Sequence, residues 1–207
     1  MTIQPSVLAV VAAVGLDWLI GDPLWLPHPV VVMGWWIQTL RARLESWAGE
    51  RPPQLQFAGL LITLILISGT ALAGWFVERL TQQAPHLGWP LLVIALASAL
   101  AGRSLRQSVM AVLKALPPNA ANELTSARER LSRIVGRDVH QLDETGIIRA
   151  CAETASENAV DGIFAPLAWM AAGCFLWALN SAAPGPLALA WAFKASSTLD
   201  SMLGYRL

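Results

Sequence analysis

The stretch Glu153-Thr-Ala-Ser-Glu157-Asn158-Ala-Val-Asp161-Gly162 places a polar cluster directly before a long apolar segment. If the stretch is helical, Glu153, Glu157 and Asp161 lie at successive i, i+4 positions, so three carboxylates share one slowly drifting face. Residues 163–193 contain no charged side chain. Carboxylates at the edge of an apolar segment are costly unless they bind something, and divalent cations, cationic substrates and internal salt bridges are the candidates. The stretch therefore predicts a membrane helix that begins beside a polar site.

The composition of the whole chain indicates a membrane protein. Hydrophobic residues make up 55% of its 207 residues and charged residues only 14%, and its mean hydropathy is +0.51. Soluble domains carry roughly 25% charged residues, so this chain has too few to cover a globular surface. Its formal net charge of zero gives no indication of nucleic-acid binding. Cys151 and Cys174 lack a metal-binding spacing, and we expect both to be small buried hydrophobes.

We expect an all-α, polytopic integral membrane protein with about four to five membrane helices, since one span needs about 20 apolar residues. Residues 1–207 form a single membrane domain in this prediction. The first span lacks the basic region that precedes a cleaved signal peptide, so it is expected to be retained. Pro184-Gly-Pro186 interrupts the last apolar segment and predicts a hairpin there. The expected spans are residues 3–20, 55–77, 87–102, 163–180 and 187–205.

The distribution of basic residues predicts the orientation in the membrane. Eight of the fourteen Lys and Arg residues lie in residues 103–161. Because cytoplasmic loops are enriched in Lys and Arg, this segment is predicted to be a cytoplasmic helical insert, with the N-terminus outside. The polar clusters of the chain then converge on one side. We expect a multi-pass protein of the cytoplasmic (inner) membrane whose polar site faces the cytoplasm.

Inside the insert, the sequence predicts helices over residues 104–116 and 122–135, followed by a turn at Gly136-Arg137-Asp138. Asp143 is the expected N-cap of the helix that carries the carboxylates. Residues 30–44 predict an amphipathic or interfacial helix, since several tryptophans there suit a membrane interface. Trp35 and Trp36 lie within this range, and Trp47 follows it closely.

Several polar groups have both a functional and a structural interpretation. The three carboxylates suit Mg²⁺, but Glu153 also suits an ordinary ion pair with Arg149. Arg137 on its turn suits phosphate or carboxylate, or a structural pair with Asp138. Arg103 at the membrane boundary suits an anionic ligand, or it extends to the lipid headgroups.

Two further segments contain candidate groups. Lys194, Thr198, Ser201 and Tyr205 recur at three- or four-residue intervals, and they predict either an anion-binding stripe or hydroxyls bonded to their own helix. His28 lies between two prolines, which excludes a routine helical core position and makes it a candidate base or substrate contact. The sequence contains no P-loop motif, so a bound ATP would be held in another way.

At these residues the sequence resembles the membrane-bound adenosylcobinamide-phosphate synthase family of cobalamin biosynthesis, CbiB/CobD. The matching stretches follow one another in the same order as in the family and extend over essentially the whole chain. It rests on Asp17-Trp-Leu-Ile-Gly-Asp-Pro23 with Pro27-His-Pro29, Ala101-Gly-Arg-Ser-Leu105, Ile134-Val-Gly-Arg-Asp138, Glu153 to Gly162 with Ala165-Pro166, and Lys194 to Tyr205.

The resemblance implies an ATP-dependent amide ligase. Such enzymes join adenosylcobyric acid to (R)-1-amino-2-propanol or its phosphate and give adenosylcobinamide or its phosphate. ATP and Mg²⁺ are the cofactors implied. The implied partners are the corrinoid and aminopropanol substrates and the lipid bilayer, with association as a homo-oligomer or with other late cobalamin-pathway membrane enzymes. No nucleic acid is expected.

The resemblance, together with the motifs, suggests roles for named residues. Glu153, Glu157 and Asp161 are predicted to be catalytic and to hold Mg²⁺ or the substrate ammonium, and His28 is a predicted catalytic proton-transfer group. The predicted substrate-binding residues are Asp22, Arg103, Arg137, Asp138, Asn158, Lys194, Thr198, Asp200 and Tyr205.

Three alternatives stay open from the sequence. One is a non-catalytic membrane sensor or regulator related to the synthases, and another is a small transporter subunit with a carboxylate-lined path. The third follows from the length of the chain: family members continue well beyond the Gly204-Tyr205 motif. We therefore expect this chain to lack the family's C-terminal part, and an inactive fragment is the third alternative.

Overall fold

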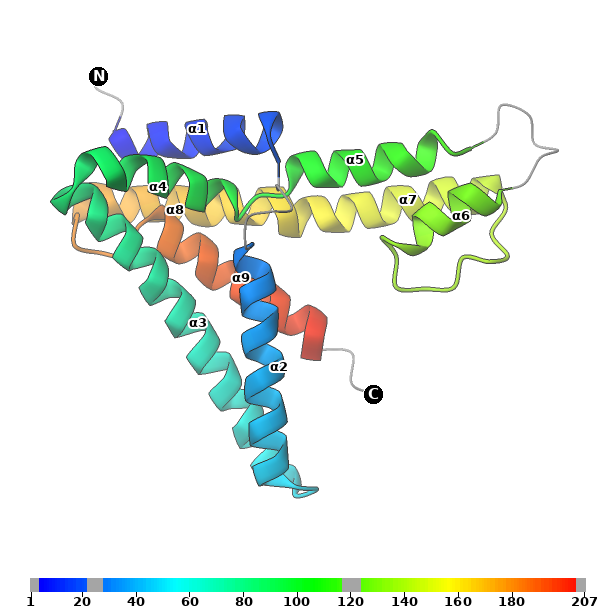
Figure 1. The fold of residues 1–207 in the computed structure, drawn as a ribbon, viewed down its shortest axis with the longest axis horizontal. Helices are drawn as coiled ribbons and strands as arrows, with labels where there is room; N and C mark the ends of the chain where they lie inside the picture. Colours follow the sequence, from blue (N-terminus) through cyan, green and yellow to red (C-terminus); the bar gives the residue numbers. More distant parts are fainter. Residues whose placement is uncertain (1–3, 22–27, 117–123, 204–207) are drawn as a thin grey trace.

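The computed structural model describes residues 4–21, 28–116 and 124–203, and over these residues it consists of helices joined by short connections, which confirms the all-α prediction (Figure 1). Prolines start several of the helices, because the first helical position needs no N–H donor. The helices are α1 (Pro5–Leu19), α2 (Pro29–Ala48), α3 (Pro52–Gln83), α4 (Pro85–Ala97), α5 (Gly102–Leu113), α6 (Thr125–Ser132), α7 (Glu144–Ala159), the π-helix η1 (Val160–Phe164), α8 (Ala165–Leu179) and α9 (Pro186–Leu203).

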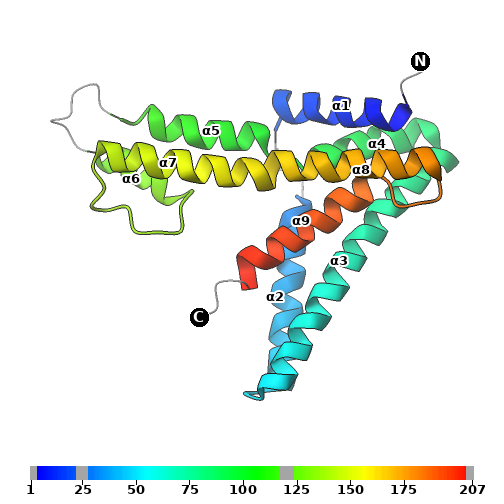
Figure 2. The same ribbon diagram turned by 180° about the vertical axis from the view of Figure 1, so that it is seen from behind.

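The helices form two arms. One arm contains α1, α4 and α8 at one end and α5, α6 and α7 at the other, with α7, η1 and α8 joined end to end (Figures 1 and 2). The second arm is the hairpin of α2 and α3, which projects from the first. Helix α9 connects the two arms, since it packs against α3, α8, α2 and α4.

Each part of the molecule has its own apolar core. One core joins α1, α4, α8 and α9, a second joins α5, α6 and α7, and a third joins α2, α3 and α9. Representative fully buried side chains are Leu96 and Met170 in the first core, Leu131 and Ile147 in the second, and Ile37 in the third. The segment predicted to be a helical insert therefore packs around a core of its own.

Three helical segments are long and apolar enough to cross a membrane, which supports a multi-pass protein. They are Pro52–Gln83, Pro85–Leu113 and Glu144–Leu179. Helix α1 is apolar but shorter, and α9 is not among these candidates. The predicted spans at residues 3–20 and 187–205 therefore stay predictions.

Several helix boundaries differ from the predicted ones. The helix breaks within the span predicted at 87–102, since α4 ends at Ala97 and α5 starts at Gly102, and the span itself stays a prediction. The amide of Ala101, in the connection, donates instead to the carbonyl of Gly162 at 2.9 Å. Helix α3 is longer than predicted, and α6 is shorter than the predicted 122–135. The N-cap prediction is confirmed, since the side chain of Asp143 accepts a hydrogen bond from the amide of Gly146 at 2.7 Å.

Candidate functional site

The centre of the candidate site is the π-helical segment η1, which joins α7 to α8. A π-helical turn contains one more residue than an α-helical turn and changes which backbone carbonyls are bonded within the helix. Here the carbonyl of Gly162 accepts from the amide of Ala101 at 2.9 Å, and the carbonyl of Asp161 accepts from Nζ of Lys194 at 3.3 Å. Gly162 is buried, and a Cβ at this position would lie 3.1 Å from that of Ala101. The distorted turn thus accepts hydrogen bonds from the connection before α5 and from α9.

Two polar motifs that are distant in sequence meet at this turn. The hydroxyl of Ser197 donates to Oδ2 of Asp161 at 3.1 Å, while Lys194 bonds to the carbonyl of the same aspartate. This contact brings the stretch 153–162 against the start of the stretch 194–205. The hairpin between α8 and α9, predicted from Pro184 to Pro186, is what returns α9 to this position.

A cleft of about 570 Å³ opens beside this contact, and we call it the central cleft. Apolar residues of α2, of α5 and of the segment after α6 form part of its wall, and hydroxyl-bearing residues of α5 and α9 form another part. Such a volume lies within the range of small-molecule sites, which is about 300–1,000 Å³. Its polar lining includes Ser104, Arg133, Asn158, Asp161, Lys194 and Thr198.

A second depression, the side pocket, lies next to the central cleft. Its volume is about 580 Å³, and Val135 lines both spaces. Arg137 donates to Oε2 of Glu153 at 2.6 Å, and Arg149 lies 3.5 Å from the other oxygen of this carboxylate. Glu157 also lines the side pocket. The predicted pair of Glu153 with Arg149 is therefore formed, and the pair with Arg137, which the sequence did not suggest, bridges α7 to the turn at Arg137.

The structure does not bring the three stripe carboxylates together. Glu153 and Glu157 line the side pocket, whereas Asp161 lines the central cleft with Asn158. Within the described residues no group of three or more His, Cys, Asp or Glu side chains is placed to hold a metal ion. The expected common face is interrupted because the π-helical segment changes the direction of Asp161. A Mg²⁺ role for these carboxylates stays a prediction.

The other predicted residues are scattered. Asp138 accepts from the amide of His140 at 2.9 Å, so it stabilises its own turn. The hydroxyl of Thr198 donates to the carbonyl of Lys194 at 2.7 Å, and Asp200 is exposed. His28 caps α2, since its Nδ1 accepts from the amide of Val30 at 3.3 Å. Asp22 and Tyr205 lie outside the described residues.

Arg103 joins α1 to α5. Its guanidinium donates to the carbonyls of Trp18 and Leu19, at 3.0 and 2.5 Å. In the opposite direction, Oδ2 of Asp17 accepts from the amide of Gly102 at 3.0 Å. The end of α1 and the start of α5 therefore cap each other, a contact that neither the anion-binding nor the headgroup interpretation of Arg103 included.

The other side of α5 carries a feature that sequence reasoning missed. A depression of about 660 Å³, here called the basic groove, lies between α5 and α6. Four cationic side chains line it: Arg103, Arg106, Lys114 and Arg130. Arg106 also lies over the ring of Trp18, 5.2 Å from the centroid. The spacing of cations along residues 103–114 was the available signal.

Glu78 is a second residue that sequence reasoning missed. It lies in α3 and is completely buried. Its carboxylate accepts hydrogen bonds from the amides of Gly185, Leu187 and Ala188 at 2.8, 2.7 and 3.1 Å. These amides start α9, so Glu78 fixes the position at which α9 departs from α3. An acidic residue directly after the uncharged segment 55–77 was the signal for it.

Comparison with known proteins identifies the family. The family model described as CobD/Cbib protein matches residues 10–207, which is nearly the entire chain. The chain belongs to the CobD/CbiB family. It is thus a member of a family of cobalamin biosynthesis enzymes, as the motifs predicted. No solved structure matches the chain.

Curated members of the CobD/CbiB family are similar over most of the chain. Cobalamin biosynthesis protein CobD of Pelobacter propionicus is 42% identical over 99% of this chain and 58% of its own length. CobD of Klebsiella pneumoniae is 41% identical over 92% of this chain and 55% of its own length. CbiB of Salmonella arizonae is 38% identical over 97% of this chain and 58% of its own length. The chain therefore spans somewhat more than half the length of these relatives.

Proposed function

We propose that this chain acts in cobalamin biosynthesis by forming an amide bond between adenosylcobyric acid and (R)-1-amino-2-propanol or its phosphate. The product would be adenosylcobinamide or its phosphate. The observation that carries the proposal is the meeting of Asp161, Lys194 and Ser197 at the central cleft. These residues belong to the two longest motifs that the chain shares with the synthases.

The residues of the central cleft suit the ligands of such a reaction. Lys194 and Arg133 attract the anionic oxygens of a carboxylate or phosphate. Asn158 and the hydroxyl groups can orient a neutral part of either substrate. The cleft thus combines cations for the anionic oxygens with one carboxylate that can hold a metal ion.

ATP and Mg²⁺ would supply the activation of the carboxylate. Mg²⁺ commonly uses one or two protein carboxylates together with phosphate oxygens and water. The single carboxylate of Asp161, beside the ammonium of Lys194, fits that donor set without the three-carboxylate group that the sequence suggested. In this proposal Asp161 would hold the metal, and Lys194 would neutralise phosphate charge.

The proposal predicts that Asp161 and Lys194 are required for amide formation. Membranes containing the chain are supplied with adenosylcobyric acid, aminopropanol phosphate, ATP and Mg²⁺, and adenosylcobinamide phosphate is measured. Asp161→Asn and Lys194→Met should each lower the rate by about 100-fold or more, because each removes a charge that faces the reacting groups. Glu50→Gln, in the exposed turn between α2 and α3, is the matched control and should change the rate less than twofold.

Corrinoid binding is measured on the same membranes, because the chain spans little more than half the length of its relatives. The native chain could bind the corrinoid without forming product, and Lys194→Met could weaken that binding. This result would assign the cleft to the corrinoid and favour a non-catalytic regulator or a fragment. A properly inserted chain that neither forms product nor binds the corrinoid would contradict the proposal. Equal turnover in the native chain and both variants would remove the central cleft from the reaction.

A further inference from the structure

We propose that the basic groove is a binding site for a ligand that carries several linked phosphate groups. Arg103, Arg106 and Lys114 enter it from α5, and Arg130 enters from α6. On α5 the positions lie three and then eight residues apart, so the cations follow one side of the helix. A row of cations, rather than a single one, matches a row of phosphates.

The remaining lining of the groove supports an anionic ligand. No carboxylate lines the groove among the residues that the structure describes. Gln107 and Ser126 add neutral polar groups, and Met110 and Ala111 add an apolar surface. The exposed cations of Lys114 and Arg130 would repel each other less with an anion between them. The groove therefore combines uncompensated positive charge with space of small-molecule size.

The folded core fixes the two sides of the groove. Val112 of α5 and Ala127 and Leu131 of α6 are fully buried in the apolar core that these helices share with α7. The cations thus project from a packed helix pair and not from a free segment. A ligand would meet a prearranged row of charges and would not have to order the backbone first.

The direction of α5 favours a polyphosphate over a lipid headgroup. Arg103 lies at the start of α5, bonded to the end of the apolar helix α1. Lys114 lies eleven residues further along, a rise of about 16 Å, on the part of α5 that points away from α1 (Figure 1). A headgroup at the membrane surface would meet the first cation, whereas Lys114 and Arg130 require an anion that extends outward.

The groove is separate from the central cleft. Ser104, Leu105 and Ser108 of α5 line the cleft, whereas Arg103, Arg106 and Lys114 line the groove. The two sites therefore use different sides of one helix. Ligand binding in the groove does not depend on amide formation in the cleft, and failure of the proposed function would leave this inference standing.

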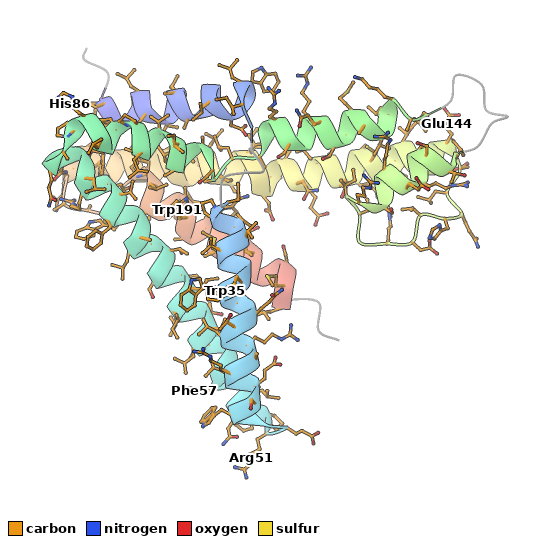
Figure 3. The ribbon with its side chains drawn as sticks, viewed as in Figure 1. Trp35, Arg51, Phe57, His86, Glu144 and Trp191 are labelled. Carbon is orange, nitrogen blue, oxygen red and sulfur yellow. The ribbon has the colours of Figure 1, made fainter. Side chains whose placement is uncertain are left out.

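The test measures binding of inorganic tripolyphosphate to the purified chain in nanodiscs of zwitterionic lipid, by calorimetry at low salt, with ATP as a second probe. Lys114→Met combined with Arg130→Met leaves the α1 contact of Arg103 intact. The matched control is Arg43→Met combined with Arg51→Met, which removes two exposed cations from the α2–α3 hairpin. Figure 3 shows Arg51 at the far tip of this hairpin.

The groove variant should bind tripolyphosphate at least about tenfold more weakly, and the control variant should bind it within about twofold of the native chain. Circular dichroism verifies the helix content of both, and Lys114→Glu alone replaces the double variant if that variant unfolds. Three results would overturn the proposal: no binding to the native chain, equal weakening in both variants, or loss of tripolyphosphate binding when anionic lipid is added. The last result would assign the groove to headgroups.

Discussion

Glu78 shows how a single side chain can set the position of a helix. Its carboxylate is buried between α3 and α9 and accepts from three backbone amides at the start of α9. The first amides of a helix have no partner within the helix, and the helix dipole favours negative charge at this end. Glu78 therefore accepts hydrogen bonds from the first amides of α9, as the side chain of an ordinary N-cap residue would.

Removing this carboxylate should destabilise the membrane domain. Glu78→Leu leaves three buried amides without the acceptor, and we expect a loss on the order of 3 kcal/mol of unfolding free energy, since bonds to charged groups are worth about 1.5–3 kcal/mol. Glu78→Gln keeps one acceptor oxygen and should lose about half as much. The measurement is thermal unfolding in detergent, followed by tryptophan fluorescence. The control Glu50→Gln should unfold at the native temperature, and a native temperature for Glu78→Leu would contradict the assigned role.

At the scale of the helices, the contact between α3 and α9 depends on close backbone approach. A Cβ added at Gly74 would lie 2.8 Å from the Cα and 2.9 Å from the nitrogen of Ala188. Both of those atoms belong to backbone, which has no flexible end that could move aside. Gly69, five residues earlier in the same helix, is exposed and has no atom within 4 Å of such a Cβ.

These two glycines provide a matched test of the α3–α9 contact. Gly74→Ala should force the helices apart and lower the unfolding free energy by about 1–3 kcal/mol. Gly69→Ala adds the same methyl group to the same helix and should be neutral or slightly stabilising, because alanine has the higher helix propensity. Both are measured by thermal unfolding in the same detergent. If the two variants lost the same stability, the close approach of Gly74 to Ala188 would not be the cause, and the assigned role of this contact would be wrong.

The sequence predicted those helices whose signals are local. Pro184 to Pro186 marked the hairpin before α9, and Asp143 marked the start of α7 through its own side chain. The π-helical segment gave no such signal. Its carbonyls accept hydrogen bonds from Ala101 and Lys194, which lie far away in the chain. The i, i+4 spacing therefore could not predict which way the side chain of Asp161 points. The carboxylate motif was therefore found, but its division between two sites was not.

At the scale of the whole molecule, the arrangement predicts a definite orientation in the membrane. The basic end of the long arm contains α5, α6 and α7, and the connection between α8 and α9 lies at the opposite end (Figure 1). The bias of Lys and Arg predicts that the basic end faces the cytoplasm. Ser132 in α6 and Ser181 between α8 and α9 are exposed at these two ends.

Cysteine labelling tests this orientation. Cys151 and Cys174 are buried, so both are first replaced by alanine, and Ser132→Cys or Ser181→Cys is then introduced. In intact spheroplasts a membrane-impermeant maleimide should label the cysteine at position 181 and leave that at position 132 unlabelled. Disrupted membranes should be labelled at both positions, which controls for reactivity. Labelling of the cysteine at position 132 in intact spheroplasts would reverse the orientation.

The Glu78 contact also determines the order in which the protein can be assembled during synthesis. The amides that Glu78 binds lie 107 to 110 residues later in the chain. At about 5–20 residues per second, the ribosome needs about 5–20 s to produce them. During that time α3 carries an acidic side chain without its final partners, and a charged group is costly in lipid. We therefore expect α3 to stay in a hydrated or shielded place until the α8–α9 hairpin arrives, and α3 and α9 to enter the folded bundle as a pair.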